Sequence, residues 1–483
     1  MNSHPPILAL PTELLLHIFS ICCWDGTTIQ VGYSRHLFRQ DLKVPTPVVL
    51  SNVSSQWRQL AESFPALWSR LRFEIGGDSG ESRVEEDDQK ESDRCHRITE
   101  YFLRCASEAP LDLVFAEVLI DLDTQYIEFD LTLDALCRRA RQWASVHFDV
   151  DHTFFQRNAA VLSKIRGNLN NLHTFQLVED PTSSPTARTI DFLVPCPSLR
   201  HADLQWSRSR PYDSGILPTL IPWRQLVRLS LFLQLDAPSV SEIVSLCPNL
   251  EHLSLGTYMT HEGNERPTSW NILSLSIEIE FTHPMHPDFW ENLTTPRLTS
   301  LDLCTSRYNP RIPLSQEREL SLLNFIRRSS STITTLSIRR TIFSPEQVVR
   351  MLELLPGLTT LYVHESEQAR DSLNIICQPY LFTHLLIDPD SGDLHSIPFL
   401  PRLTTFRIVV HGDDLAHEAL IEALRSRWIP DPSVSARIGI DSLRSVEVSF
   451  LDKTTNVPES LLGLKELKRE GLRVLVPDVC HSL

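Results

Sequence analysis

The chain has 483 residues, more than the roughly 250 to 300 at which a single hydrophobic core stops growing. We therefore expect two domains, or one repetitive domain with a small appendage. Hydrophobic residues make up 42% of the chain and charged residues 22%, which excludes a mostly disordered protein. Leucine stands out with 72 of the 483 residues, and this abundance favours a fold of stacked short elements.

The charge and the cysteine pattern exclude several classes of partner and site. The formal net charge of −16 repels phosphate backbones and anionic lipid, so we expect neither nucleic acid nor a membrane as a partner. The N-terminal apolar stretch is broken by Pro11, Glu13 and His17, which is typical of neither a signal peptide nor a membrane span. Ten scattered cysteines without zinc spacing indicate reduced thiols. These features favour a cytoplasmic or nuclear protein.

Two amphipathic helices are predicted near the N-terminus. The first follows Pro11 and Thr12, with apolar residues at helical spacing through Cys22. The second has Thr46 as its N-cap and Pro47 at its first position, with apolar spacing that continues to Phe64. So few short helices make a thin core, which leaves large apolar residues for a partner to cover.

The ordered motifs of this segment resemble an F-box. They read Leu-Pro-x-Glu-Leu-Leu-x-x-Ile-Phe, then Val-x-x-x-Trp-Arg-x-Leu-Ala, and finally Pro-x-Leu-Trp, over about residues 7 to 70. The resemblance implies docking onto the Skp adaptor of a cullin-type ubiquitin ligase. It places the following residues at adaptor-binding positions: Leu10, Pro11, Leu14, Ile18, Val53 and Trp57. Helices that only cap the next domain are the alternative.

Two features depart from the common F-box pattern. Ser54 stands where many members have Cys, and residues 24 to 45 form a longer link between the first helices. Such a link is familiar in the large F-box group of mushroom-forming fungi, which the chain as a whole resembles. The resemblance implies an F-box over residues 1–75.

Residues 76–94 are predicted to form an acidic flexible loop. Between residues 78 and 93 there are eight acidic residues and two basic ones, and such a run buries too little apolar surface to offset its ordering entropy. An acidic patch that attracts a basic partner is the alternative. Beyond it, Ile98, Tyr101 and Phe102 share a helix face, and Leu111, Leu113 and Phe115 alternate as in a strand.

An L-x-x-L-x-L spacing recurs through the rest of the chain. Its clearest copies are Leu226/Leu229/Leu231, Leu250/Leu253/Leu255, Leu298/Leu301/Leu303, Ile333/Leu336/Ile338, Leu358/Leu361/Val363, Leu403/Phe406/Ile408 and Leu443/Val446/Val448. Weaker copies begin at Trp143, Leu172, Leu199, Trp270, Phe382 and Leu472. The intervals are mostly those of leucine-rich repeats.

The repeat predicts an α/β fold in which parallel strands alternate with helices. The alternating pair of each copy points inward, and the leading residue packs behind it. Each unit covers only part of its own core and needs its neighbours. We expect an irregular leucine-rich-repeat solenoid, or horseshoe, over residues 95–483, without the asparagine ladder usual in such repeats.

No catalytic motif is present, and no cofactor or metal is implied. The chain lacks G-x-S-x-G, P-loop, G-x-G-x-x-G and H-E-x-x-H patterns. The histidines at 283 and 286 are flanked by prolines and indicate a surface turn. We therefore expect a non-catalytic protein, and an enzyme is the least favoured hypothesis.

Strand positions that point away from the core are the candidates for binding a protein substrate. We select one group among these mixed polar and aromatic residues: Phe232, Arg339, Tyr362, His364 and Arg407. The resulting hypothesis is the substrate-recognition subunit of an SCF-type ligase, which binds the Skp adaptor at one end and a protein substrate on the repeats. A repeat scaffold without a role in ubiquitination is the alternative.

Overall fold

The computed structural model describes most of the chain and divides it into two compact units. The described residues are 10–23, 26–31, 44–78, 85–118, 125–126, 129–150, 152–179, 191–206, 221–233, 237–257, 267–279, 287–305, 315–340, 343–366, 375–387, 398–411, 415–451 and 462–476. The first unit comprises Met1–Leu229 and Leu246–Asn249, and the second comprises Ser230–Ser245 and Leu250–Leu483. Strand β8 (Arg228–Leu233) begins in the first unit and ends in the second.

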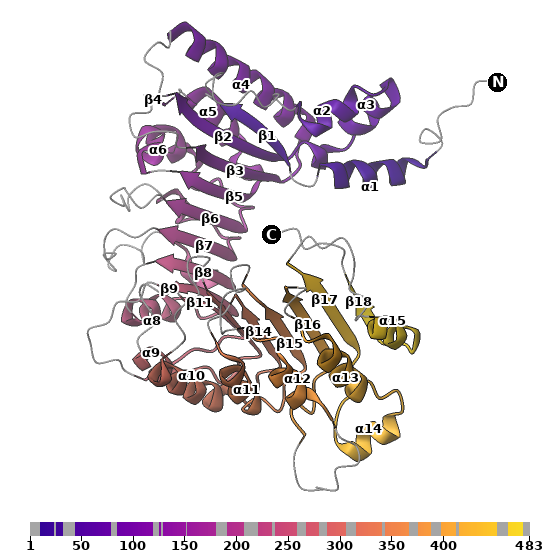
Figure 1. The fold of residues 1–483 in the computed structure, drawn as a ribbon. Coiled ribbons are helices and arrows are strands. Elements are labelled where there is room, and N and C mark those ends of the chain that lie inside the picture. The colour runs from indigo at the N-terminus through magenta and orange to yellow at the C-terminus, as the bar shows by residue number, and fades with distance from the viewer. Residues whose placement is uncertain are drawn as a thin grey trace, which may run out of the picture. The chain divides into compact units, whose positions relative to one another are not determined.

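The first unit alternates helices with strands (Figure 1). Its helices are α1 (Thr12–Cys22), α2 (Thr46–Ser51), α3 (Ser55–Glu62), α4 (Glu85–Ala106), α5 (Asp130–Cys137), α6 (His152–Arg157) and α7 (Ala159–Leu162). Its 3-10 turns are η2 (Pro65–Leu67), η3 (Ala140–Gln142), η4 (Ser163–Ile165), η5 (Asp191–Leu193) and η7 (Trp223–Gln225). Its strands are β1 (Thr27–Val31), β2 (Arg70–Asp78), β3 (Leu111–Val118), β4 (Gln125–Tyr126), β5 (Trp143–Val150), β6 (Thr174–Glu179) and β7 (His201–Trp206).

The strands of the first unit form a parallel sheet in the order β1-β2-β3-β5-β6-β7, with β4 antiparallel to the end of β2. Stacked phenylalanines fill its interior. The rings of Phe73, Phe115 and Phe148 lie on three neighbouring strands, and their centroids are 5.5 and 4.9 Å apart. The polar residues between them stay at least partly exposed, so one side of the sheet carries the core.

The second unit repeats the same alternation. Its strands are β9 (His252–Thr257), β10 (Thr268–Ser269), β11 (Ser274–Ile279), β12 (Leu293–Thr294), β13 (Ser300–Thr305), β14 (Thr335–Arg339), β15 (Thr360–His364), β16 (Thr405–Val410), β17 (Ser445–Phe450) and β18 (Arg473–Leu475). Its helices are α8 (Ala237–Ser245), α9 (Pro287–Asn292), α10 (Gln316–Ser329), α11 (Pro345–Glu353), α12 (Pro379–Leu385), α13 (His417–Arg427), α14 (Pro432–Ile438) and α15 (Leu462–Arg469).

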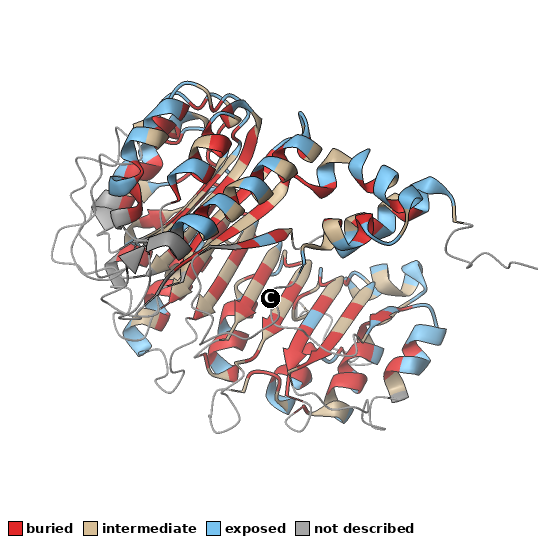
Figure 2. Cartoon of the chain, turned by 90° about the horizontal axis from the view of Figure 1, so that it is seen from above, coloured by how far each residue is buried: buried red, intermediate tan, exposed pale blue. Residues whose placement is uncertain are grey.

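The predicted repeat register is confirmed in the second unit. The order is β9-β11-β13-β14-β15-β16-β17-β18, all parallel, and Leu301, Leu336, Leu361 and Phe406 are register partners from strand to strand. Every residue of the seven clearest copies is at most 4% exposed. Figure 2 shows the resulting alternation of buried and half-buried residues along these strands. Burial of the leucines therefore holds successive copies together.

Three of the weaker copies were placed wrongly. Strand β11 buries Leu275 and Ile277, so its copy begins at Ile272 and not at Trp270. The copy assigned to Phe382 is the helix α12. In β18 it is Val474 that pairs with Val446, which shifts that copy one residue from Leu472. Short apolar runs do not distinguish helix from strand, and these copies lack the strict alternation of the others.

The predicted boundary at residue 75 does not separate two folding units. Strands β1 and β2 lie within residues 1–75, yet β2 pairs along its length with β3 of the repeat region. The alternation of the buried residues Leu71, Phe73 and Ile75 is typical of a strand. We did not predict this strand, because the segment follows directly on the helical motifs. The three N-terminal helices are therefore an extension of the first unit.

The acidic segment is not a loop from residue 85 onward, because α4 begins at Glu85. Farther along, Arg94 pairs with Glu91 at 3.0 Å, while Ser92 and Cys95 are buried. Residues 79–84 lie outside the described residues. The prediction of a flexible loop over residues 76–94 is wrong for its helical half.

A ladder of threonines lies before four of the strands, in repeats for which we expected no asparagine ladder. Thr299, Thr334, Thr359 and Thr404 each precede a strand, and each Oγ1 donates to a carbonyl oxygen of the preceding copy over 3.0 to 3.3 Å. The same carbonyls also accept two backbone N–H groups, as Thr299 does from Thr334 and Thr335. These threonines satisfy the turn backbone at the start of the strands, a role that asparagine fills at another position in regular repeats.

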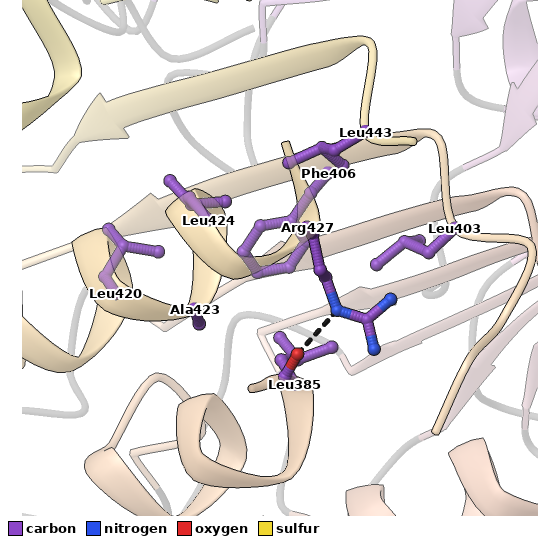
Figure 3. Close-up of a pocket in the computed structure, with 8 residues that line it drawn as sticks. All are labelled: Leu385, Leu403, Phe406, Leu420, Ala423, Leu424, Arg427 and Leu443. Carbon is purple, nitrogen blue, oxygen red and sulfur yellow. Dashed lines mark hydrogen bonds between the residues drawn. The ribbon is translucent and has the colours of Figure 1, made fainter. Parts of the chain in front are cut away.

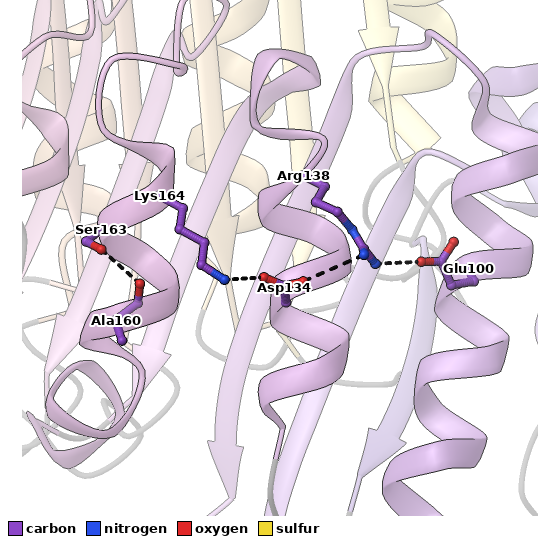
Figure 4. A network of polar contacts seen from close by, with 6 residues as sticks. All are labelled: Glu100, Asp134, Arg138, Ala160, Ser163 and Lys164. Atoms are coloured by element: carbon purple, nitrogen blue, oxygen red, sulfur yellow. Dashed lines mark hydrogen bonds and ion pairs between the residues drawn. The ribbon is translucent and has the colours of Figure 1, made fainter.

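An ion-pair network joins neighbouring helical elements of the first unit (Figure 4). Lys164 of η4 donates from Nζ to Asp134 Oδ1 over 2.6 Å. Arg138 lies 3.7 Å from the other oxygen of Asp134 and 3.1 Å from Glu100 of α4. The Lys164 hydrogen bond, with the nearby cations, holds the pKa of Asp134 below its ordinary value.

Asp134→Asn should therefore lower the free energy of unfolding by about 0.5 kcal/mol at neutral pH. Because the folded-state pKa of Asp134 is depressed, its contribution is present above the ordinary aspartate pKa and is lost as pH falls through the folded value. Denaturant unfolding of both proteins should show the difference disappearing below about pH 4. A difference that persists unchanged to lower pH would contradict this account.

Candidate functional site

An apolar stripe on α1 faces solvent. Leu14, Ile18 and Ile21 are 50%, 36% and 60% exposed, and their spacing puts them on one helix face. The opposite face is buried through Leu15 and Phe19. This helix therefore has apolar residues on both sides, although only one side packs against the rest of the chain.

Helix α2 and the turn after it add two more exposed apolar side chains. Val49 is 48% exposed and Val53 is 57% exposed. Helix α2 contacts both α1 and α3. We refer to Leu14, Ile18, Ile21, Val49 and Val53 together as the exposed apolar set.

Trp57 does not belong to this surface. The helix predicted from Thr46 to Phe64 breaks at Val53, and the Oγ of Ser54 caps α3 by accepting from the Trp57 backbone N–H over 3.1 Å. The Trp57 ring is only 7% exposed and packs on Phe19 with 4.8 Å between centroids. The expectation of an adaptor-facing Trp57 is thus corrected, because its ring holds α1 against α3.

The other predicted adaptor residues divide by exposure. Pro11, Leu14, Ile18 and Val53 are exposed, while Leu10 is half-buried. The sequence reasoning missed Ile21 and Val49. Ile21 lies three residues after Ile18, so helical spacing alone could have placed it on the same face.

Trp68 anchors the three helices to the repeat region. Its Nε1 donates to the Ala61 carbonyl over 2.8 Å, and its ring meets Phe102 of α4 edge-on at 5.1 Å. It is completely buried. A partner that binds the exposed apolar set would therefore engage a part of the chain that is fixed to the first unit.

A second candidate site lies on the half-exposed face of strands β13 to β17. It comprises Asp302, Arg339, Tyr362, His364, Arg407 and Glu447, which we call the charged band. In register, Tyr362 is next to Arg407, and Arg407 is next to Glu447. Four of the five predicted substrate residues are therefore brought together by the sheet.

The charged band is internally bonded. Arg339 makes a two-pronged ion pair with Asp302, through Nε over 2.9 Å and through Nη2. Arg407 contacts Glu447 at 2.8 Å, and its guanidinium lies 5.5 Å from the centre of the Tyr362 ring. The Tyr362 hydroxyl is 3.4 Å from Nδ1 of His364. These contacts pre-organise the two arginines on either side of the tyrosine.

Phe232, the fifth predicted residue, lies apart from the charged band. Its ring covers Gly256, where an added Cβ would come within 1.9 Å of it. Glu278 and Cys304 occupy the equivalent positions on the two strands between Gly256 and Arg339. Phe232 thus packs on a glycine of β9 and is not part of the same cluster.

A small cavity in the second unit surrounds Arg427 and is structural. Leucines, Phe406 and Ala423 line it, as Figure 3 shows. The guanidinium donates to the carbonyls of Leu385 over 2.6 Å, Leu400 over 3.0 Å, and Phe399. Burial lowers the pKa of Arg427 to about 10, so it stays charged at neutral pH.

The described thiols and acids give no sign of metal or thiolate chemistry. No group of three or more His, Cys, Asp or Glu side chains in the described ranges could hold a metal ion. The described cysteines are free thiols, and burial raises the pKa of Cys23 to about 11 and of Cys137 to about 12. The histidines at 283 and 286 lie outside the described residues.

Comparisons with known proteins leave the family open. No family model matches the chain, and no curated protein matches it. A chain of the yeast Rad7–Elc1 complex aligns at 13% identity over 76% of this chain and 92% of its own length, with a TM-score of 0.34. A chain of the TLR13–ssRNA13 complex aligns at 13% identity over 76% and 53%, with a TM-score of 0.32. At these TM-scores neither likeness supports a statement about fold or function.

None of the helices in the described ranges has the length and apolar character needed to cross a bilayer.

Proposed function

We propose that the chain is a non-catalytic substrate receptor, whose helices α1 to α3 bind the Skp adaptor of a cullin-type ubiquitin ligase. The exposed apolar set is the observation that carries this proposal. Leu14, Ile18 and Val53 match positions that the F-box resemblance assigns to adaptor binding, and all three are exposed. Exposed apolar side chains on a small helical extension commonly mark a protein interface.

The second half of the proposal assigns substrate capture to the repeats. The strands present polar side chains in rows, and the charged band is the cluster whose members are bonded to one another. Rows of side chains on parallel strands are the surfaces that repeat proteins use for binding. In this arrangement the chain supplies recognition, and other subunits of the ligase supply the chemistry.

Adaptor binding tests the first half. We expect the double variant Ile18→Asp/Val53→Asp to bind purified Skp adaptor at least about thirtyfold more weakly, because a charge would be buried against an apolar partner. Leu131→Asp on α5 is the matched control, since Leu131 is also an exposed aliphatic residue of the first unit, at 50%, and lies outside the exposed apolar set. It should leave adaptor affinity unchanged, and all three proteins should melt together.

The outcomes separate the proposal from its alternative. Absence of adaptor binding, or binding that the double variant retains, overturns the docking assignment. Adaptor binding without assembly of a cullin complex would instead support the repeat scaffold that plays no part in ubiquitination.

A further inference from the structure

The order of charges from strand to strand is symmetric, although Arg339 lies opposite His364 and Arg407 lies opposite Tyr362. From β13 to β17 the strands present Asp302, Arg339, then Tyr362 with His364, then Arg407, and finally Glu447. Two cationic groups thus flank the central tyrosine, and a carboxylate lies outside each of them. The side chains of Arg339 and Arg407 are 38% and 49% exposed, whereas Asp302 and Glu447 are 18% and 24% exposed.

Both arginines keep hydrogen-bond donors for a ligand. A guanidinium has five N–H donors. Arg339 uses Nε and Nη2 toward Asp302, and Arg407 uses Nη2 toward Glu447. The carboxylates therefore orient the guanidinium groups without exhausting them, and they hold Arg407 over Tyr362.

We propose that the charged band binds an extended peptide segment with one anionic side chain at its centre and a basic side chain on either side. The anion would lie over Tyr362 between the two guanidinium groups, and the basic side chains would lie near Asp302 and Glu447. Such a peptide would be the substrate class of the proposed receptor. The peptide site itself does not depend on the receptor function, and only the word substrate rests on it.

Strand spacing sets the spacing within the ligand. Neighbouring strands lie about 4.8 Å apart, so the centre of the charged band is about 10 Å from each outer carboxylate. A peptide in the polyproline II conformation advances about 3.1 Å per residue and has three residues per turn, so it covers that distance in about three residues and keeps the three charged side chains on one face. The matching pattern is Lys-x-x-Glu-x-x-Lys, with phosphoserine as the alternative source of the central anion.

A continuous polyanion does not fit this arrangement. The outer carboxylates repel additional negative charge, and the whole chain carries a formal charge of −16. Single-stranded RNA, which presents a phosphate at every nucleotide, would meet Asp302 and Glu447 as well as the two arginines. The charge pattern therefore favours a peptide of alternating charge over a nucleic acid.

The test uses the purified full chain and fluorescent peptides, without the adaptor. The Lys-x-x-Glu-x-x-Lys peptide should bind at least about tenfold more tightly than Glu-x-x-Lys-x-x-Glu, which inverts the charges. A phosphoserine version identifies the anion: tighter binding than the Glu peptide assigns the site to phosphate, and weaker binding assigns it to carboxylate. Equal binding of the charge-inverted peptides, no binding up to about 1 mM, or displacement of the peptide by single-stranded RNA overturns the proposal.

Variants tie the selectivity to the charged band. Arg407→Gln should weaken binding of the matching peptide about tenfold. Arg425→Gln is the matched control, because Arg425 is 55% exposed and pairs with Glu466 at 2.9 Å on a helix. The exchange Arg407→Glu/Glu447→Arg retains an ion pair but moves the cation to the outer strand. It should abolish the preference for the matching peptide over the charge-inverted peptide. Retained preference in the exchange variant would contradict the assignment.

Failure of this inference is distinguishable from failure of the proposed function. Adaptor affinity is measured on the same preparations. Intact adaptor binding without peptide selectivity overturns the peptide site alone, whereas peptide selectivity without adaptor binding overturns the receptor assignment alone.

Discussion

Replacing Arg427 by alanine should lower the free energy of unfolding by about 3 kcal/mol. The side chain is 2% exposed, and its acceptors are the carbonyls of Leu385, Phe399 and Leu400. Removing it leaves three carbonyls without this donor and opens a cavity, and each effect costs about 1 kcal/mol or more. Relief of the buried charge offsets part of that loss. Chemical denaturation of the variant and the parent protein measures the difference.

Two further variants separate packing from hydrogen bonding at Arg427. Arg427→Met retains an unbranched apolar stem without donors, and Arg427→Lys retains the charge but cannot reach three carbonyls from one planar group. Both should be less stable than the parent, and Lys should recover part of the loss. A Met variant as stable as the parent would mean that the three hydrogen bonds contribute no net stability.

Arg427 also fixes an unusual backbone turn at Leu400. Leu400 has a backbone φ of 47°, in the left-handed region that non-glycine residues rarely adopt. Arg427 donates to its carbonyl and to that of the preceding residue, while the Arg427 carbonyl accepts from the Leu443 N–H. The arginine therefore connects the end of α13 to the turn before β16 and to the residues before β17.

The repeat register was predictable from the sequence, whereas several surfaces were not. Leu336, Leu361 and Phe406 recur with strict alternation because burial selects one face of each strand, and this periodicity is visible in a single sequence. Trp57 shows the limit of the same reasoning. An apolar residue in a docking motif and an apolar residue in a small core have the same chemistry, so only the packing on Phe19 distinguishes them.

Long-range pairing accounts for the other differences. The contacts of Arg339 with Asp302 and of Arg407 with Glu447 join residues 37 and 40 positions apart, which no local pattern records. The predicted binding residues were selected by strand face, and the fold then determined which of them are neighbours. The segment that begins at Glu85 differs for another reason. Its acidic composition indicated a loop, but it is the first part of the long helix α4.

The core and the charged band should respond differently to mutation. Leu336 is completely buried in β14 between Leu301 and Leu361. We expect Leu336→Ala to lower the free energy of unfolding by about 2 to 5 kcal/mol, through lost burial and the cavity that remains. Adaptor and peptide binding should persist in whatever fraction of the variant stays folded.

The double variant Tyr362→Phe/Arg407→Gln should instead lose peptide binding while costing about 1 kcal/mol or less of stability. Arg407 is half exposed, and exposed ion pairs contribute little because water screens them and the side chain loses freedom on pairing. Tyr362→Phe keeps the ring and removes only the hydroxyl near His364. Denaturation midpoints and peptide titrations of the same samples measure both quantities. The recognition role would be contradicted if the surface variant lowered the free energy of unfolding as much as Leu336→Ala does. The ion pairs of the charged band would then stabilise the fold and would not indicate a binding site.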